Sequence, residues 1–121
     1  MADIVTDRDV ERALHVFSDL TAPRQDGSTE IGILIRNDNF YAALVPVVEA
    51  KLAEVISNRE PKLAADKIKW QARASNEYHK AIGQAARAAG ELGSARLRLK
   101  WAENVIEIYR TQCANNRRGN L

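Results

Sequence analysis

The sequence predicts an all-α protein of about four helices, in which a long, kinked second helix packs against a long, coiled-coil-like C-terminal helix. Three observations support this fold class. Aromatic residues make up only 6% of the 121 residues and alanine is abundant, a composition that favours helix over sheet. Apolar residues recur at helical spacing along most of the chain, and capping residues precede several of these stretches. We expect one helical domain over residues 1–121, with frayed ends at 1–5 and 115–121.

The first helix is expected to begin after Thr6, whose hydroxyl can cap it. Asp9 would complete a capping box, although Glu or Gln is more usual at that position. Val10, Leu14 and Phe17 recur at helical spacing, with Ala13 beside them, so they predict the side of this helix that packs against the rest of the protein.

After a loop at residues 21–28, one long helix is expected from Thr29 to Ser57. Its start is ambiguous, because the alternating isoleucines of Ile31–Ile35 also suit a strand. Pro46 should kink the helix, since proline removes one backbone hydrogen bond. The predicted apolar stripe consists of Tyr41, Leu44, Val48, Leu52 and Val55.

A third helix is expected from Pro61 to Ala74, because proline suits the first position of a helix. Ser75 or Asn76 can cap the fourth helix, which shows the clearest pattern of the chain. It has a heptad seam through five repeats, in which Arg96 occupies the one step without an apolar residue. Its three glycines weaken the helix by about 1 kcal/mol each or permit close packing. The predicted seam consists of Tyr78, Ile82, Ala85, Ala89, Leu92, Leu99, Ala102, Ile106, Tyr109 and Cys113.

The segment RLRLKW, residues 96–101, fits either a charged strand or an ordinary helical surface. On a helix, Lys100 precedes Glu103 by three residues and Glu107 precedes Arg110 by three. These opposite charges can pair with each other, which favours a solvated helical face.

The opposite side of the same helix is an apolar arc about twice as wide as one neighbouring helix requires. We therefore expect a second copy of the protein as one neighbour, and hence a homo-oligomer. Arg98 lies near the middle of the arc, where it either meets a carboxylate or extends its head group into water. The predicted oligomer interface consists of Leu97, Arg98, Trp101, Val105 and Ile108.

Basic residues of the third helix form a candidate DNA-binding site. Lys62, Lys69 and Arg73 share a face at spacings of seven and four, with Trp70 at its edge. Basic side chains follow a phosphate backbone, and an aromatic ring offers a base a stacking surface. The alternative is a solvated lysine stripe with the tryptophan in the core.

The charge is divided unevenly along the chain. Residues 1–60 contain 6 Lys/Arg and 11 Asp/Glu, a net charge of −5, whereas residues 61–121 contain 12 and 5, a net charge of +7. This division indicates an anionic partner for the C-terminal half or head-to-tail contact between copies, or it arises by chance in a short chain.

The sequence shows no pattern typical of an enzyme. His15 and His79 are isolated, and there is no glycine-rich phosphate loop, CxxC or HExxH motif. We therefore expect no catalytic site, no cofactor, no bound metal and no small-molecule substrate. The single cysteine, the lack of a signal peptide and the absence of a long apolar stretch lead us to expect a cytoplasmic protein without a membrane partner.

The order of the helices and several short patterns resemble a family of small helical phage and prophage proteins of unassigned function. The shared patterns are an Ala-x-x-x-Tyr step, here Ala74 to Tyr78, and an ending matched by Tyr109, Arg110, Thr111, Ala114 and Arg117. More distantly, the layout is similar to phage recombination mediators of the UvsY type. Those proteins form rings, bind single-stranded DNA and help to load a recombinase.

The resemblance implies a non-enzymatic phage or prophage accessory protein of DNA recombination or replication. Such a protein would self-assemble, bind single-stranded DNA, and work with a recombinase or a single-strand-binding protein in the cytoplasm of the host cell. The rival hypothesis is a helical protein–protein adaptor, or a phage structural or anti-host protein, that does not bind DNA.

Overall fold

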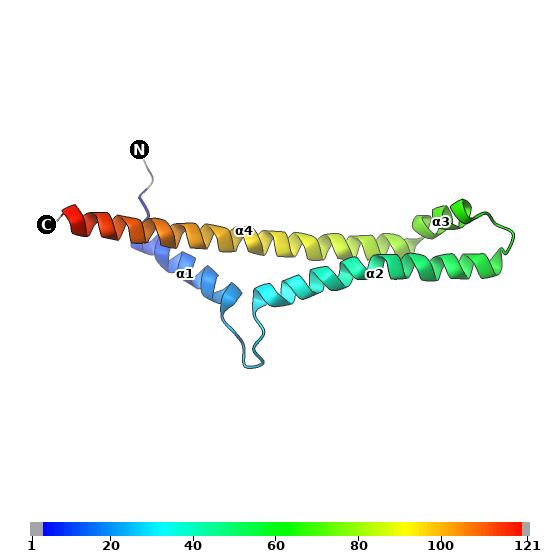
Figure 1. The fold of residues 1–121 in the computed structure, drawn as a ribbon, viewed down its shortest axis with the longest axis horizontal. Helices are drawn as coiled ribbons and strands as arrows, with labels where there is room; N and C mark the ends of the chain where they lie inside the picture. The colour runs from blue at the N-terminus through cyan, green and yellow to red at the C-terminus, as the bar shows by residue number, and fades with distance from the viewer. Residues whose placement is uncertain (1–3, 120–121) are drawn as a thin grey trace. The chain divides into compact units, whose positions relative to one another are not determined.

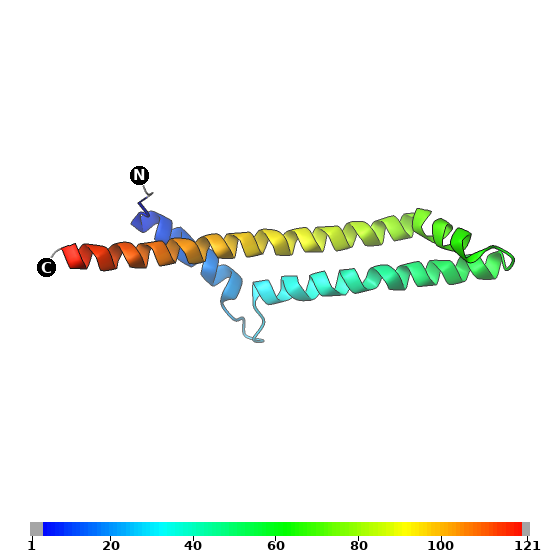
Figure 2. The ribbon, with the colours of Figure 1, turned by 45° about the horizontal axis from the view of Figure 1, so that its top comes forward.

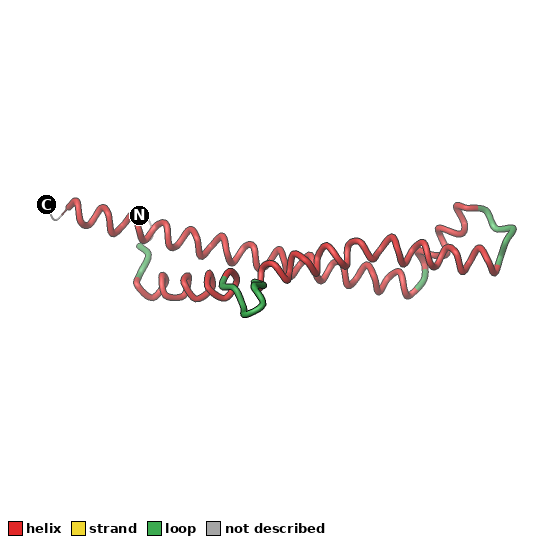
Figure 3. Tube along the Cα trace, turned by 60° about the horizontal axis from the view of Figure 1, so that its bottom comes forward, coloured by secondary structure: helices red, strands yellow, loops and turns green. Residues whose placement is uncertain are grey.

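The computed structural model describes residues 4–119, and this part of the chain consists of α-helices and loops without strands (Figure 3). The helices are α1 (Asp7–Thr21), α2 (Glu30–Arg59), α3 (Ala65–Ala74) and α4 (Asn76–Gly119). The predicted all-α class is confirmed, and so is the pairing of a long second helix with a long C-terminal helix (Figures 1 and 2). The chain divides into two compact units. Unit 1 contains the residues up to Ile33 and those from Gly93 onward, and unit 2 is Leu34–Leu92.

In unit 1, α1 begins with the capping box that the sequence predicts. The amide of Asp9 donates to Thr6 Oγ1 at 3.2 Å, and the amide of Thr6 donates to Asp9 Oδ2 at 3.0 Å. These hydrogen bonds hold the pKa of Asp9 below its ordinary value of 3.8. The shorter aspartate therefore performs here the role that glutamate usually has.

The side of α1 that packs on α4 matches the prediction at Val10 and Ala13 but not at Leu14 and Phe17. Ala13 and Leu20 are the buried residues of α1, whereas Leu14 is 50% exposed and Phe17 is 38% exposed. Small residues line the contact, which lets the two backbones approach closely and leaves larger side chains at its margins. The core of this contact is Ala13, Ala102 and Val105, with Val5, Val10, Val16 and Ile106 packed around it.

Hydrogen bonds also fasten the segment before α1 to α4. The side-chain amide of Gln112 accepts from the Val5 amide at 2.8 Å and donates to the Val5 carbonyl at 3.0 Å. These bonds hold Val5, and α4 continues through residues 115–119 to Gly119, while fraying of the chain ends stays a prediction. Ile4, in the same predicted range, is 73% exposed, and residues 1–3 and 120–121 lie outside the described residues.

In unit 2, α2 and the first part of α4 run antiparallel beside each other (Figures 1 and 2). The ambiguous Ile31–Ile35 segment is helical, and the amide of Gly32 donates to Thr29 Oγ1 at the start of α2. The predicted stripe of α2 is correct as far as Leu52, which is half-buried. Beyond it, Ile56 is buried and Val55 is 58% exposed, because a straight helix drifts away from a strict seven-residue repeat.

On one side of α4, the buried residues lie one position earlier in the sequence than predicted. Ile82, Ala89 and Arg96 are exposed. Ala81, Ala88 and Ala95, seven residues apart, are buried in their place. Leu92 and Ala102 of the predicted seam are buried as expected, and Val105 is buried as well. The sequence analysis placed the large Ile82 in the seam. The helices approach closely, however, so small side chains occupy the contact. The glycines do not mediate this packing, since a Cβ atom at Gly83, Gly90 or Gly93 would meet nothing within 4 Å.

The RLRLKW segment lies within α4, so it is a helical surface. Its charged residues are exposed, as are Glu103, Glu107 and Arg110. The predicted pairing among them is wrong, because the ion pairs within residues 4–119 are Arg24–Glu30 and Arg73–Glu49. Exposed charges are well solvated by water, and pairing would cost the conformational entropy of two long side chains, so such pairs contribute little stability.

The position of the α4 seam can be tested with two neighbouring alanines. Ala88→Leu should reduce the free energy of unfolding by about 1–3 kcal/mol, because a larger side chain overpacks a buried site. Ala89→Leu, one residue later and exposed, should change it by no more than about 0.5 kcal/mol. Urea unfolding followed by circular dichroism measures both effects. A larger loss for Ala89→Leu would restore the seam predicted from the sequence.

A second prediction concerns Tyr109, whose hydroxyl donates to Asp7 Oδ1 at 3.0 Å. This hydrogen bond, together with the nearby Cys113 thiol, raises the pKa of Tyr109 from 10.0 to about 12. Because the pKa is higher in the folded protein, this stabilisation is complete below pH 10.0 and is lost as the pH rises through about 12. Near-ultraviolet titration, with Tyr109→Phe as the reference, should isolate this phenol. Asp7→Asn should move its pKa back toward 10.0, and an unchanged pKa would contradict the assignment.

Candidate nucleic-acid interface

The basic helix α3 begins later than predicted, at Ala65 rather than at Pro61. Glu60, Pro61, Lys62 and Leu63 form a turn closed by a hydrogen bond from the Leu63 amide to the Glu60 carbonyl at 3.1 Å. Proline suits the second position of such a turn, because its ring fixes the required backbone angle. Lys62 therefore lies in the turn, and it does not share a helical face with Lys69 and Arg73.

The inner side of α3 packs within unit 2. Ala72 is fully buried and Ile68 is half-buried, one helical turn apart. Arg73 Nε donates to Glu49 Oε1 of α2 at 2.9 Å, which joins the two helices by an ion pair. At the end of α3, Ser75 accepts a hydrogen bond from the Tyr78 amide and thereby caps α4, as the sequence predicts.

Three of the four predicted site residues lie together on α3, and two of them, Lys69 and Arg73, also border α2. Lys69, Trp70 and Arg73 line one open hollow of about 620 Å³, with Asp66 and Ala74. Trp70 is 79% exposed, so the alternative that places it in the core is wrong. Lys62 lines a different hollow with Glu60, Pro61 and Leu63.

Few free positive charges surround this hollow. Lys69 and Arg73 line it together with one acidic residue, Asp66. Arg73 is also paired with Glu49, and half of its side chain remains exposed. The surface can therefore stack a planar base on the Trp70 indole and place Lys69 near a phosphate, but one copy supplies few free positive charges.

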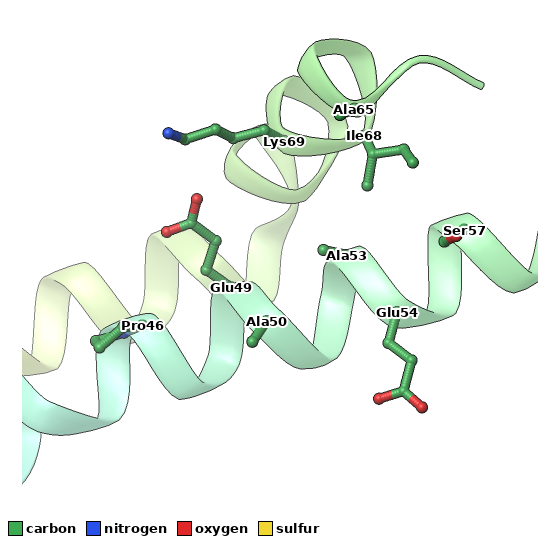
Figure 4. A pocket seen from close by; sticks show the side chains of 9 residues that line it. All are labelled: Pro46, Glu49, Ala50, Ala53, Glu54, Ser57, Ala65, Ile68 and Lys69. Carbon is green, nitrogen blue, oxygen red and sulfur yellow. The ribbon is translucent and has the colours of Figure 1, made fainter.

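A second hollow lies between α2 and α3 and measures about 590 Å³ (Figure 4). Glu49 and Lys69 are near each other at one end, and alanines, Pro46 and Ile68 form much of the remaining wall. It is open to solvent and has no converging set of polar groups, so it lacks the features of a small-molecule site.

The predicted oligomer interface on α4 is open at most of its positions. Leu97 is 71% exposed, Arg98 is exposed, and Trp101 and Ile108 are 40% and 45% exposed. The Arg12 guanidinium lies 5.9 Å from the centre of the Trp101 ring, a cation–π contact from α1. Val105 is only 8% exposed because it packs with Ala13 and Ala102, so it belongs to the core of unit 1 and not to an open surface.

The sequence analysis did not single out an exposed apolar surface of α2 that includes Phe40 and Val47. The run FYAALVPVV, residues 40–48, contains no charged residue, which is more apolar surface than one neighbouring helix can cover. Phe40 is 58% exposed and Val47 is 46% exposed. This uncharged run was the signal that could have revealed the face.

Residues 4–119 contain no group of three or more His, Cys, Asp or Glu side chains that could hold a metal ion. His15 and His79 are exposed and far apart in the sequence. No helix among the described residues is long and apolar enough to cross a membrane. The fold and its surfaces thus define a small all-α protein with open apolar and mixed-charge faces. No protein-family model, curated protein or solved structure matches the chain.

The exposed position of Trp70 predicts that it contributes little to folding. Trp70→Ala should change the free energy of unfolding by no more than about 0.5 kcal/mol, as for other exposed residues. Leu20→Ala, which empties a site that is 1% exposed, should reduce it by about 2–5 kcal/mol. Urea unfolding of both variants gives the comparison. A loss of more than 2 kcal/mol for Trp70→Ala would show that the indole has a structural role.

Proposed function

We propose that this protein is a non-enzymatic, self-assembling helical protein that binds single-stranded DNA through the outer side of α3. The observation that best supports the proposal is the exposure of Trp70 beside Lys69 and Arg73. A tryptophan this exposed contributes little to a core, whereas it can stack with a nucleic acid base. The adjacent basic groups provide phosphate contacts on the same surface.

Self-assembly is the second part of the proposal, because one copy has too few free cations for strong binding. Several copies on one strand would combine weak contacts into useful affinity. The exposed Leu97, Trp101 and Ile108 of α4 supply apolar surface that such assembly can bury. The accessory role in recombination or replication, the phage or prophage origin, and the recombinase or single-strand-binding partner are proposed from the resemblance alone.

The DNA-binding proposal predicts salt-sensitive affinity for single-stranded oligonucleotides. Trp70→Ala should weaken binding by about 1–3 kcal/mol for each base that the indole stacks. Lys69→Ala with Arg73→Ala should reduce the slope of log affinity against log salt by about 0.7 to 1.4, since each phosphate contact contributes about 0.7 and Glu49 competes for Arg73. Fluorescence anisotropy with a labelled oligonucleotide, titrated at several salt concentrations, measures both quantities.

The matched control is Arg96→Ala with Lys100→Ala, which removes the same charge from an exposed part of α4. Its effect on the salt slope should be small if α3 is the binding surface. Equal losses for the two double variants would indicate attraction by net charge alone. Unchanged binding by both the Trp70 and the α3 variants would contradict the assigned site.

The second candidate function is a protein–protein adaptor, and the small number of free positive charges around α3 favours it. Glu49 holds Arg73, and Asp66 lies in the same hollow as Trp70. Exposed tryptophans are also common centres of protein interfaces. An adaptor would not bind the oligonucleotide even at low salt, so the same titration distinguishes the two functions.

A further inference from the structure

The outer face of α2 consists of six exposed residues in a regular series. They lie at alternating steps of four and three along the helix, so they form one stripe. Its centre is apolar and its two ends carry opposite charges. In order, the outer face of α2 is Arg36, Phe40, Ala43, Val47, Ala50 and Glu54.

Within unit 2, α4 packs on another side of α2, and α3 borders the stripe only at Ala50 and Glu54, which also line the hollow between α2 and α3. The buried and half-buried residues of α2 lie on another side, through Tyr41, Val48, Leu52 and Ile56, where α4 packs. Figure 4 shows Glu54 pointing away from α3, on the opposite side of α2 from Lys69. Phe40 and Val47 consequently remain about half exposed, at 58% and 46%.

The stripe is self-complementary, because its spacing is the same when read from either end. A second α2 can lie antiparallel to the first, with the two-fold axis level with residue 45. Two residues of the two copies then face each other when their numbers add up to 90. Phe40 then faces Ala50 of the second copy, and Ala43 faces Val47 of the second copy. A large side chain meets a small one in each apolar layer, which is the arrangement that fills space without overpacking.

Charge complementarity selects this register among the neighbouring ones. In it, Arg36 of each copy faces Glu54 of the other, so an ion pair closes both ends of the apolar contact. Sliding the second helix by seven residues in one direction would place Glu54 against Ala43. Sliding it the other way would place Arg36 against Val47. Both shifts set a charge against an apolar residue without a partner.

We propose that the outer face of α2 binds the same face of a second copy, giving an antiparallel, two-fold symmetric dimer. Interfaces of this kind are self-complementary by symmetry, as this stripe is. The inference deepens the self-assembly in the proposed function and rests on it. It assigns a surface separate from the α4 residues; at Ala50 and Glu54 this surface adjoins the hollow that Lys69 of α3 also lines.

A charge-exchange experiment tests the partner and the register together. Arg36→Glu places like charges at both ends of the contact, and Glu54→Arg does the same with the opposite sign. Each single variant should raise the dimer dissociation constant by at least about tenfold. The double variant Arg36→Glu with Glu54→Arg recreates both ion pairs and should return within about threefold of the original protein. Sedimentation equilibrium over a range of protein concentrations provides the dissociation constants.

Arg87→Glu is the matched control, since it makes the same charge change at an exposed residue of α4 in the same unit. It should leave the dissociation constant within about threefold of the original value. Circular dichroism of every variant verifies that the helices remain intact. DNA binding is measured on the same samples, so loss of pairing and loss of DNA contact are recorded separately.

The outcomes distinguish this inference from the proposed function. An original protein that remains monomeric at high concentration would overturn both the α2 pairing and the proposed self-assembly. An oligomer that neither single variant weakens would overturn the α2 pairing and leave assembly through Leu97 and Trp101. Weakened single variants without recovery in the double variant would overturn the antiparallel register. Recovery in the double variant supports the pairing as stated.

Discussion

Close approach of helices along lines of alanine determines how this protein is built. Ala81 and Ala88 are buried in unit 2, and Ala102 is buried in unit 1 against Ala13 of α1. Small side chains bring the backbones near each other, so the contacts between helices are tight but enclose little volume. Leu20 is the only large side chain among the described residues that is less than 2% exposed. Stability therefore arises from many small contacts, helix caps and hydrogen bonds such as those between Val5 and Gln112.

A packing scheme based on alanine also explains why large apolar residues remain outside. Trp70, Leu97 and Phe40 belong to three different helices, and none has space in a core of this kind. Monomeric proteins seldom expose several such faces, and faces of this type are typical of surfaces that bind partners. Base stacking on α3 and helix pairing on α2 would both use side chains that folding leaves free. The proposed functions thus draw on surface that the fold does not require.

The sequence was sufficient for the number of helices, most of their ends and the caps, because these depend on residues close together in the chain. On one side of α4, the seam predicted from the sequence lies one residue later than the buried residues. The charged Arg96 in the predicted seam indicated this error, because Ala95 continues the buried series of Ala81 and Ala88. Lys69, Trp70 and Arg73 follow from helical spacing. Lys62 was misplaced because Pro61 favours a turn as readily as a helix start. The partner of Arg73 is Glu49, 24 residues away, and no local pattern indicates it.

The exposed glycines of α4 have a consequence for how the protein opens. Gly83, Gly90 and Gly93 lie near the point, between Leu92 and Gly93, where α4 passes from unit 2 to unit 1. Glycine lowers helix stability most when nothing packs against it, and here nothing crowds the three positions. Within the interior of α4, this stretch is therefore where backbone amides should exchange with solvent most readily. A break at that point would leave two cooperative folding blocks, each retaining its own line of buried alanines.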